Sequence, residues 1–154
     1  MNATYPLTIY YDASCRLCNS EMQNIKIHDA DNQLILIDCS ANDFDQTPFL
    51  AEGISKEKMM NRLHAQDASG KWLVGVDAFV VIYRTVGLNL LANLWGHPLT
   101  KPIAERLYPW VVRHRYVLSK LGLPELFTLW GKYAAKKAEK RSRKCADGRC
   151  SVSE

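Results

Sequence analysis

The most informative stretch of this sequence is residues 7–18, LTIYYDASCRLC, which sets two cysteines between a strand and a helix. The run Leu7–Tyr11 is apolar and rich in residues that favour strands. Residues 19–28 carry apolar side chains at helical spacing, among them Met22 and Ile25. The cysteines therefore lie at a predicted strand-to-helix junction, which is a chemically special position.

Cys15 falls near the first turn of this predicted helix, where unpaired backbone N–H groups and the helix dipole stabilise a thiolate. Such settings lower a cysteine pKa from about 8.5 to roughly 3.5–7.5. Cys18 lies one turn further in and is expected to be the more buried thiol. The arrangement predicts a redox pair in which Cys15 attacks a disulfide and Cys18 resolves the mixed disulfide. Two alternatives stay open, since this spacing also makes half of a zinc site and the thiols are inert if buried.

The residues after the first helix predict a mixed α/β fold. The patterns indicate strands over 34–38, 59–66 and 72–76, and helices over about 45–52 and 78–94. Asp67-Ala68-Ser69-Gly70 is a good hairpin turn, and Asp77 is a plausible N-cap for the last of these helices. The order β-α-β followed by β-β-α is that of thioredoxin-like proteins, with the first two strands parallel and the hairpin antiparallel.

The chain beyond residue 97 is predicted to be helical. One helix spans about 101–120 with an interruption near Pro109, and a second spans 124 to about 143. We expect a thioredoxin-like core over residues 5–96, a helical extension packed on it over 97–143, and a flexible tail over 144–154.

Composition and charge limit the classes of function. A chain of 154 residues with 47% apolar residues suits one soluble domain. It has neither the features of a signal peptide at its start nor a run of about 18 uncharged apolar residues, so we predict a cytoplasmic protein. The net charge is +4, and its excess lies in residues 132–154. Basic residues there could attract nucleic acid or an anionic membrane, but we favour a solvated helix end and expect neither partner.

Residues 11–18 resemble the motif of the DCC family of thiol-disulfide oxidoreductases, Tyr-Asp-Gly-x-Cys-x-x-Cys, with Ala13 in place of the glycine. Two further stretches are similar to family segments: residues 74–78, VGVDA, before a helix, and residues 108–116, YPWVVRHRY, in a late helix. The resemblance spans about residues 5–122.

The resemblance implies a thioredoxin-like fold and dithiol/disulfide exchange. We expect protein or low-molecular-weight disulfides as substrates and another dithiol, such as that of thioredoxin or glutathione systems, as the source of electrons. It also raises the interest of Asp12, for which three interpretations stay open: an acid that assists proton transfer to Cys18, a cap for loop N–H groups, or a solvated turn residue. No organic cofactor is expected, because the sequence has no dinucleotide or phosphate-loop motif. Unlike thioredoxins, the chain has no proline just before its predicted third strand.

A second cysteine pair, Cys145 and Cys150, lies in the predicted tail. One hypothesis makes it a mobile shuttle dithiol that passes electrons between Cys15/Cys18 and an outside partner. Another joins all four cysteines as ligands of Zn²⁺ or an iron–sulfur cluster, so that the chain is a metal-binding or adaptor module. A third is a plain, oxidisable tail. Cys39 is predicted to be a small core residue instead.

Overall fold

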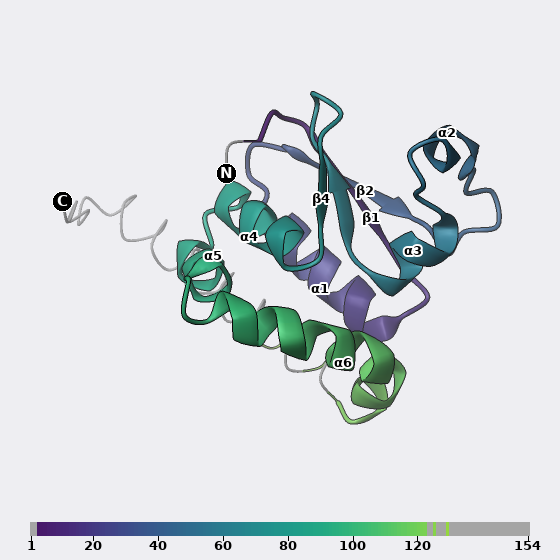
Figure 1. Cartoon of the computed structure of the whole chain (residues 1–154). Coiled ribbons are helices and arrows are strands. Elements are labelled where there is room, and N and C mark those ends of the chain that lie inside the picture. Colours follow the sequence, from purple (N-terminus) through teal and green to yellow (C-terminus); the bar gives the residue numbers. More distant parts are fainter. Residues whose placement is uncertain (1–2, 123–124, 126–128, 130–154) are drawn as a thin grey trace, which may run out of the picture.

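The computed structural model describes residues 3–122 together with residues 125 and 129 (Figure 1). Four strands form one mixed sheet in the order β2-β1-β3-β4. They are β1 (Leu7–Tyr11), β2 (Leu34–Asp38), β3 (His64–Gln66) and β4 (Trp72–Val74). β1 pairs parallel with β2 and antiparallel with β3, and β3 pairs antiparallel with β4. The predicted mixed α/β fold is confirmed, and its strand arrangement is consistent with a thioredoxin-like fold followed by a C-terminal helix.

Helices cover both faces of this sheet. α1 (Arg16–Ile27) and α4 (Val76–Thr85) pack their apolar side chains on the face to which Leu7 and Ile9 point. Tyr10 points to the other face, where it packs with Cys39 and Met59 beneath the segment that carries α2 (Thr47–Leu50) and α3 (Lys56–Asn61). This alternation along β1 follows from the strand period of two and buries the strand on both sides.

Two more helices complete the described chain, α5 (Asn89–Gly96) and α6 (Lys101–Lys120). Figure 1 shows α6 running along the side of α1 and α4 that is turned away from the sheet, and α6 contacts both helices and α5. Tyr108 ties α6 to the core because its hydroxyl oxygen accepts the backbone N–H of Leu63 at 2.8 Å in a buried bond. The division of the chain into core, extension and tail stays a prediction.

The predicted strand over 59–66 is wrong in its first half. Residues 56–61 form α3, and only His64–Gln66 form β3. The reason is local, because Ser55 is the N-cap of α3 and its side chain accepts the backbone N–H of Lys58 at 3.3 Å. The predicted hairpin turn is correct, since the N–H of Gly70 donates to the carbonyl of Asp67 at 2.9 Å.

Two predictions about the later helices also need correction. The helix predicted over 78–94 is two helices, because the chain reverses at Gly87 with a φ of 74°, a conformation that glycine adopts without strain. The residue at the N-cap of α4 is Gly75, whereas Asp77 lies in the first turn and pairs with Lys101 at 2.7 Å. The expected interruption at Pro109 is absent, and α6 continues through it. Tertiary packing on both sides of the proline outweighs its missing hydrogen bond.

Replacement of Tyr108 with Phe tests the tie between α6 and the core. The variant leaves the buried N–H of Leu63 without its acceptor, so we expect the free energy of unfolding to fall by about 1–3 kcal/mol. Urea denaturation measures the change. Tyr5→Phe is the matched control, because the Tyr5 hydroxyl is bonded in an exposed position. Equal stabilities of the two variants would contradict the proposed tie.

Candidate active site

Cys15 is the N-cap residue of α1, and the two cysteine side chains of the first motif lie together. The Sγ atoms of Cys15 and Cys18 are 2.8 Å apart, and both thiols are free. A disulfide bond is about 2.05 Å long, so the pair is a reduced dithiol in which the Cys18 thiol donates to Cys15. The backbone N–H of Cys18 also donates to the Cys15 sulfur, at 3.4 Å. Cys15 thus takes the place that a Ser or Asp oxygen takes in other helix caps.

The surroundings push the pKa values of these two thiols in opposite directions. The hydrogen bond from the Cys18 thiol is the main cause that lowers the pKa of Cys15 to about 6, against the effect of burial. The Cys18 backbone N–H and the charge of Arg115 lower it further, while Asp12 opposes them. The same thiol–thiol bond, followed by burial, raises the pKa of Cys18. The surroundings therefore favour a thiolate on Cys15 and a protonated thiol on Cys18.

The relative burial of the two thiols is the reverse of the prediction. Cys15 is 0% exposed, whereas Cys18 is partly exposed. The cause is the capping geometry, since the Cys15 side chain folds back over the first turn to accept the N–H of Cys18. Cys18 lies on the side of α1 that lines a large cavity.

Asp12, which follows the last residue of β1, is buried, and both of its carboxylate oxygens accept hydrogen bonds. Its Oδ1 accepts the backbone N–H of Ser14 at 3.0 Å and the Ser14 hydroxyl at 2.5 Å. Its Oδ2 accepts from Nη2 of Arg115 at 2.8 Å and from the hydroxyl of Tyr116 at 3.1 Å. Asp12 is therefore not a solvated turn residue. It satisfies a loop N–H group and forms a buried ion pair with a residue more than a hundred positions away.

Arg115 and Tyr116 are site residues that sequence reasoning did not identify. Both belong to α6, and Arg115 also donates through Nη1 to the backbone carbonyl of Met60 at the end of α3. The guanidinium of Arg115 thus connects α6 to the end of β1 and to α3. A signal was present in the sequence, because residues 108–116 are one of the stretches that resemble the family, but nothing local shows what the arginine binds.

Asp38 and Ser40 hold the dithiol loop from the other side. Asp38 ends β2 opposite the end of β1, and its Oδ1 accepts the backbone N–H of Ala13 at 3.1 Å. The same oxygen accepts the hydroxyl of Ser40 at 2.6 Å, and the Ser40 oxygen in turn accepts the N–H of Ser14 at 3.2 Å. Parallel pairing of β1 and β2 makes this possible, since it sets their carboxyl ends side by side.

Glu21 is a second residue that sequence reasoning missed. It lies one helical turn after Cys18 on α1, is 8% exposed and accepts the hydroxyl of Tyr83 at 2.5 Å. Burial raises the pKa of Glu21, although the bond from Tyr83 acts in the opposite direction. Its second oxygen, Oε2, is buried and has no hydrogen-bond partner among the residues that the structure describes. The sequence signal is a glutamate on a helix face that otherwise turns to the core.

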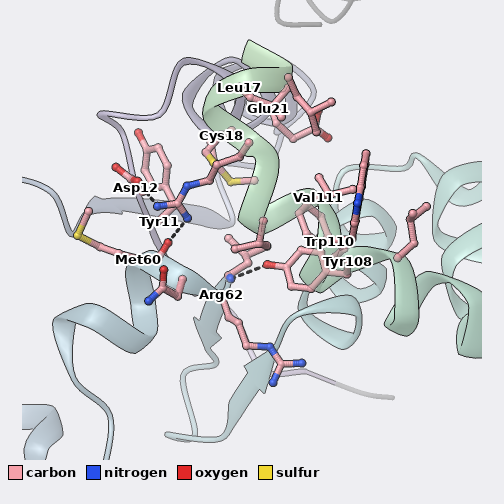
Figure 2. A pocket seen from close by; sticks show the side chains of 18 of the residues that line it. Tyr11, Asp12, Leu17, Cys18, Glu21, Met60, Arg62, Tyr108, Trp110 and Val111 are labelled. Carbon is pink, nitrogen blue, oxygen red and sulfur yellow. Dashed lines mark hydrogen bonds and ion pairs between the residues drawn. The ribbon is translucent and has the colours of Figure 1, made fainter. Parts of the chain in front are cut away.

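A cavity of about 770 Å³ lies between α1, α3, α4, α5 and α6. Cys18, Asp12, Glu21 and Arg115 are among the residues that line it, whereas Cys15 is not. Figure 2 shows Cys18 and Glu21 on one side of this space, with Tyr108 and Trp110 facing them from α6. The cavity joins the dithiol, the ion pair and the carboxyl of Glu21 in one site.

Cys39 does not belong to this site. It is fully buried, its sulfur lies 3.8 Å from the sulfur of Met59, and burial raises its pKa to about 12. The prediction that Cys39 is a core residue is confirmed.

Cys145 and Cys150 lie outside the described residues. Within residues 3–122, 125 and 129, no group of three or more His, Cys, Asp or Glu side chains is arranged to hold a metal ion. None of the helices described is long and apolar enough to cross a membrane.

A parallel βαβ unit followed by an antiparallel hairpin and a helix, with a dithiol at the start of the first helix, defines the class of thioredoxin-like thiol proteins. A family model described as DCC1-like thiol-disulfide oxidoreductase matches residues 9–121. The chain therefore belongs to the DCC1-like thiol-disulfide oxidoreductase family, which confirms the resemblance seen in its motifs.

One curated relative is similar over most of the chain. It is an uncharacterised chloroplastic protein of Arabidopsis thaliana, 27% identical over 128 residues. The match covers 79% of this chain and 56% of the relative, so this chain spans little more than half of that protein's length. No solved structure gives a significant match.

Replacement of Asp12 with Asn tests the electrostatics of the dithiol. The carboxylate raises the pKa of Cys15 and neutralises Arg115, so its loss favours the thiolate on both counts. We expect the pKa of Cys15 to fall below its value of about 6. The ultraviolet absorbance of the thiolate as a function of pH measures it, with Cys15→Ser as the blank.

Asp31→Asn is the matched control for this experiment, because Asp31 is exposed and lies near the opposite end of β2. This variant should leave the pKa of Cys15 unchanged. A pKa in Asp12→Asn that equals or exceeds that of the native chain would show that Asp12 does not tune the thiolate.

Proposed function

We propose that this chain is a thiol-disulfide oxidoreductase in which Cys15 and Cys18 exchange electrons with disulfide substrates. The observation that carries the proposal is the contact between the two sulfurs, which lie 2.8 Å apart with Cys15 at the N-cap of α1, in surroundings that lower the pKa of Cys15. A thiolate is the nucleophile in disulfide exchange, and a neighbouring thiol is what resolves the mixed disulfide. Substrates are protein or low-molecular-weight disulfides.

The reaction then has two steps. The Cys15 thiolate attacks one sulfur of the substrate disulfide, whose other sulfur leaves as a thiolate and takes up a proton. Cys18 next gives up its proton to the departing substrate sulfur and attacks Cys15, so that the mixed disulfide breaks, the Cys15–Cys18 disulfide forms and both substrate sulfurs end as thiols. Two electrons pass from the protein to the substrate. Because Cys15 is 0% exposed, the first step requires the groups that cover it to shift.

Asp12 acts in this scheme by tuning and positioning. Its two oxygens already accept four hydrogen bonds, so the acceptor positions of the carboxylate are occupied by Ser14, Arg115 and Tyr116 and not by Cys18. Its charge raises the pKa of Cys15, whereas the charge of its partner Arg115 lowers it. The two charges of the ion pair therefore partly cancel in their effect on the pKa of Cys15. We therefore assign Asp12 to tuning and not to proton transfer.

Trapping of the mixed disulfide tests the order of attack. Cys18→Ser should react with hydroxyethyl disulfide and accumulate a mixed disulfide on Cys15, because the resolving thiol is missing. Peptide mass spectrometry after acid quench locates the adduct. Cys39→Ala is the control and should form the Cys15–Cys18 disulfide, since Cys39 lies on the other side of the sheet. An adduct on Cys18 in Cys15→Ser, with none on Cys15 in Cys18→Ser, would reverse the assignment.

We further propose that thioredoxin or glutathione supplies the electrons in the cytoplasm, and that Cys145 and Cys150 serve as a shuttle dithiol. The sequence supports this proposal because Cys145 and Cys150 are five positions apart and form a second closely spaced cysteine pair, with Gly148 between them. The alternative is a metal-binding module in which Cys15, Cys18, Cys145 and Cys150 are the ligands. Stoichiometric zinc or an iron–sulfur absorbance in the isolated full chain would favour that alternative.

The double variant Cys145→Ser/Cys150→Ser tests the shuttle. If the second pair relays electrons, steady-state turnover with thioredoxin as reductant should fall severalfold in this variant. The single-turnover rate, at which reduced Cys15 and Cys18 react with a disulfide, should fall by less. Both rates follow from alkylation and mass spectrometry of quenched samples. Turnover equal to that of the native chain would show that the tail cysteines take no part.

A further inference from the structure

We propose that the large apolar cavity beside Cys18 binds the substrate, and that this substrate is a low-molecular-weight disulfide with an apolar body and an anionic group. The inference rests on the proposed thiol-disulfide exchange and specifies its substrate class. Three observations carry it: the shape of the cavity, the thiol that opens into it, and two unpaired arginines where it meets a second cavity.

The cavity has the size and walls of a small-molecule site. Its volume of about 770 Å³ lies within the range of roughly 300–1,000 Å³ that is usual for such sites. Its lining is mainly aliphatic, aromatic and thioether side chains, including Met22, Leu91, Trp95 and Leu107. Leu107 is 52% exposed although apolar, as is Trp110 in the same wall. An apolar ligand body would remove this surface from water.

The dithiol meets this cavity through Cys18. Cys18 lines the cavity and is partly exposed, and the Cys15 sulfur lies 2.8 Å behind it. A compact disulfide held in the cavity therefore lies against Cys18 and close to Cys15, and attack by Cys15, which does not line the cavity, requires the same shift of the groups that cover it. Among the described residues that line the cavity, the buried Oε2 of Glu21 and Nε of Arg115 lack a hydrogen-bond partner, and a thiol released from the ligand would supply a donor to Oε2.

Positive charge gathers where this cavity adjoins a second one of about 530 Å³. The two cavities share Arg62 and Arg115, and Arg113 lines the second. The charge of Arg115 is matched by Asp12, but within the described part of the chain no carboxylate pairs with Arg62 or Arg113. Figure 2 shows Arg62 and Glu21 at opposite ends of the group of labelled side chains. Guanidinium groups suit carboxylates and phosphates, so an anionic group on the ligand fits here.

Exchange with such a ligand uses the chemistry already described. The protein thiolate forms a bond to one ligand sulfur as the ligand S–S bond breaks, and the second ligand sulfur leaves with a proton. The second protein thiol then displaces the first ligand sulfur. The protein is oxidised to its Cys15–Cys18 disulfide and the ligand is reduced by two electrons to a dithiol.

Lipoate and lipoamide are suitable probes, because they share a dithiolane ring and an aliphatic chain and differ in one negative charge. Hydroxyethyl disulfide is a neutral disulfide without an apolar body. The pre-reduced full chain is mixed with each, quenched with acid, alkylated and mapped by mass spectrometry for the Cys15–Cys18 disulfide. We expect the second-order rate constant for lipoate to exceed that for lipoamide by roughly two- to tenfold at low salt, and the ratio to shrink as salt is added.

Two variants locate the anionic contact. Arg62→Gln/Arg113→Gln should bring the ratio of lipoate to lipoamide rates close to one. Arg106→Gln is the matched control and should keep the native ratio, because Arg106 is an exposed arginine of α6 that lines neither cavity. Trp110→Ala should slow both dithiolane probes relative to hydroxyethyl disulfide, since it removes part of the apolar wall.

The outcomes separate this inference from the proposed function. A Cys15–Cys18 disulfide formed with hydroxyethyl disulfide, but equal rates for lipoate and lipoamide, would overturn the anion site and leave the oxidoreductase in place. A lipoate preference that survives in Arg62→Gln/Arg113→Gln would overturn its location. Faster reaction with a protein disulfide than with either dithiolane would overturn the small-molecule substrate. No Cys15–Cys18 disulfide with any probe would overturn the proposed function itself.

Discussion

The buried ion pair between Asp12 and Arg115 is the interaction on which the site depends. It joins the end of the first strand to the last described helix, and through the carbonyl of Met60 it reaches α3 as well. The side chains of the pair are 1% and 9% exposed, respectively. Loss of one partner from a buried pair typically costs about 3–5 kcal/mol, because the other charge is left unpaired. The helix that follows the sheet is therefore part of the candidate site and not an appendage to it.

Hydrogen bonds from Cys18, helped by the charge of Arg115, explain how the surroundings of a fully buried cysteine can favour its thiolate. Burial alone would raise the pKa of Cys15, and the carboxylate of Asp12 acts in the same direction. The hydrogen bonds from the Cys18 thiol and backbone N–H, with the charge of Arg115, outweigh both. The hydrogen bond from the Cys18 thiol contributes most to this effect. Because Cys18 is the donor of that bond, the same bond raises the pKa of Cys18. The two sulfurs are best regarded as one acid that holds one proton.

Sequence reasoning succeeded where local pattern and tertiary structure agree. The strand before the dithiol, the helix after it and the hairpin at residues 67–70 all occur as predicted. It failed where short segments are decided by their neighbours. Residues 59–61 have the apolar character of a strand but belong to a helix that Ser55 caps, and Pro109 lies within a continuous helix because packing holds α6 on both sides of it.

The sequence by itself determined the class of fold and the family, because a strand, two cysteines and a helix follow one another within 21 positions, residues 7–27. Only the tertiary structure decided which thiol faces the cavity, what Asp12 binds and which other residues belong to the site. Arg115 lies 103 positions from Asp12, and Tyr83 lies 62 positions from Glu21. Contacts of that kind depend on how helices pack across a sheet, and no local spacing encodes them.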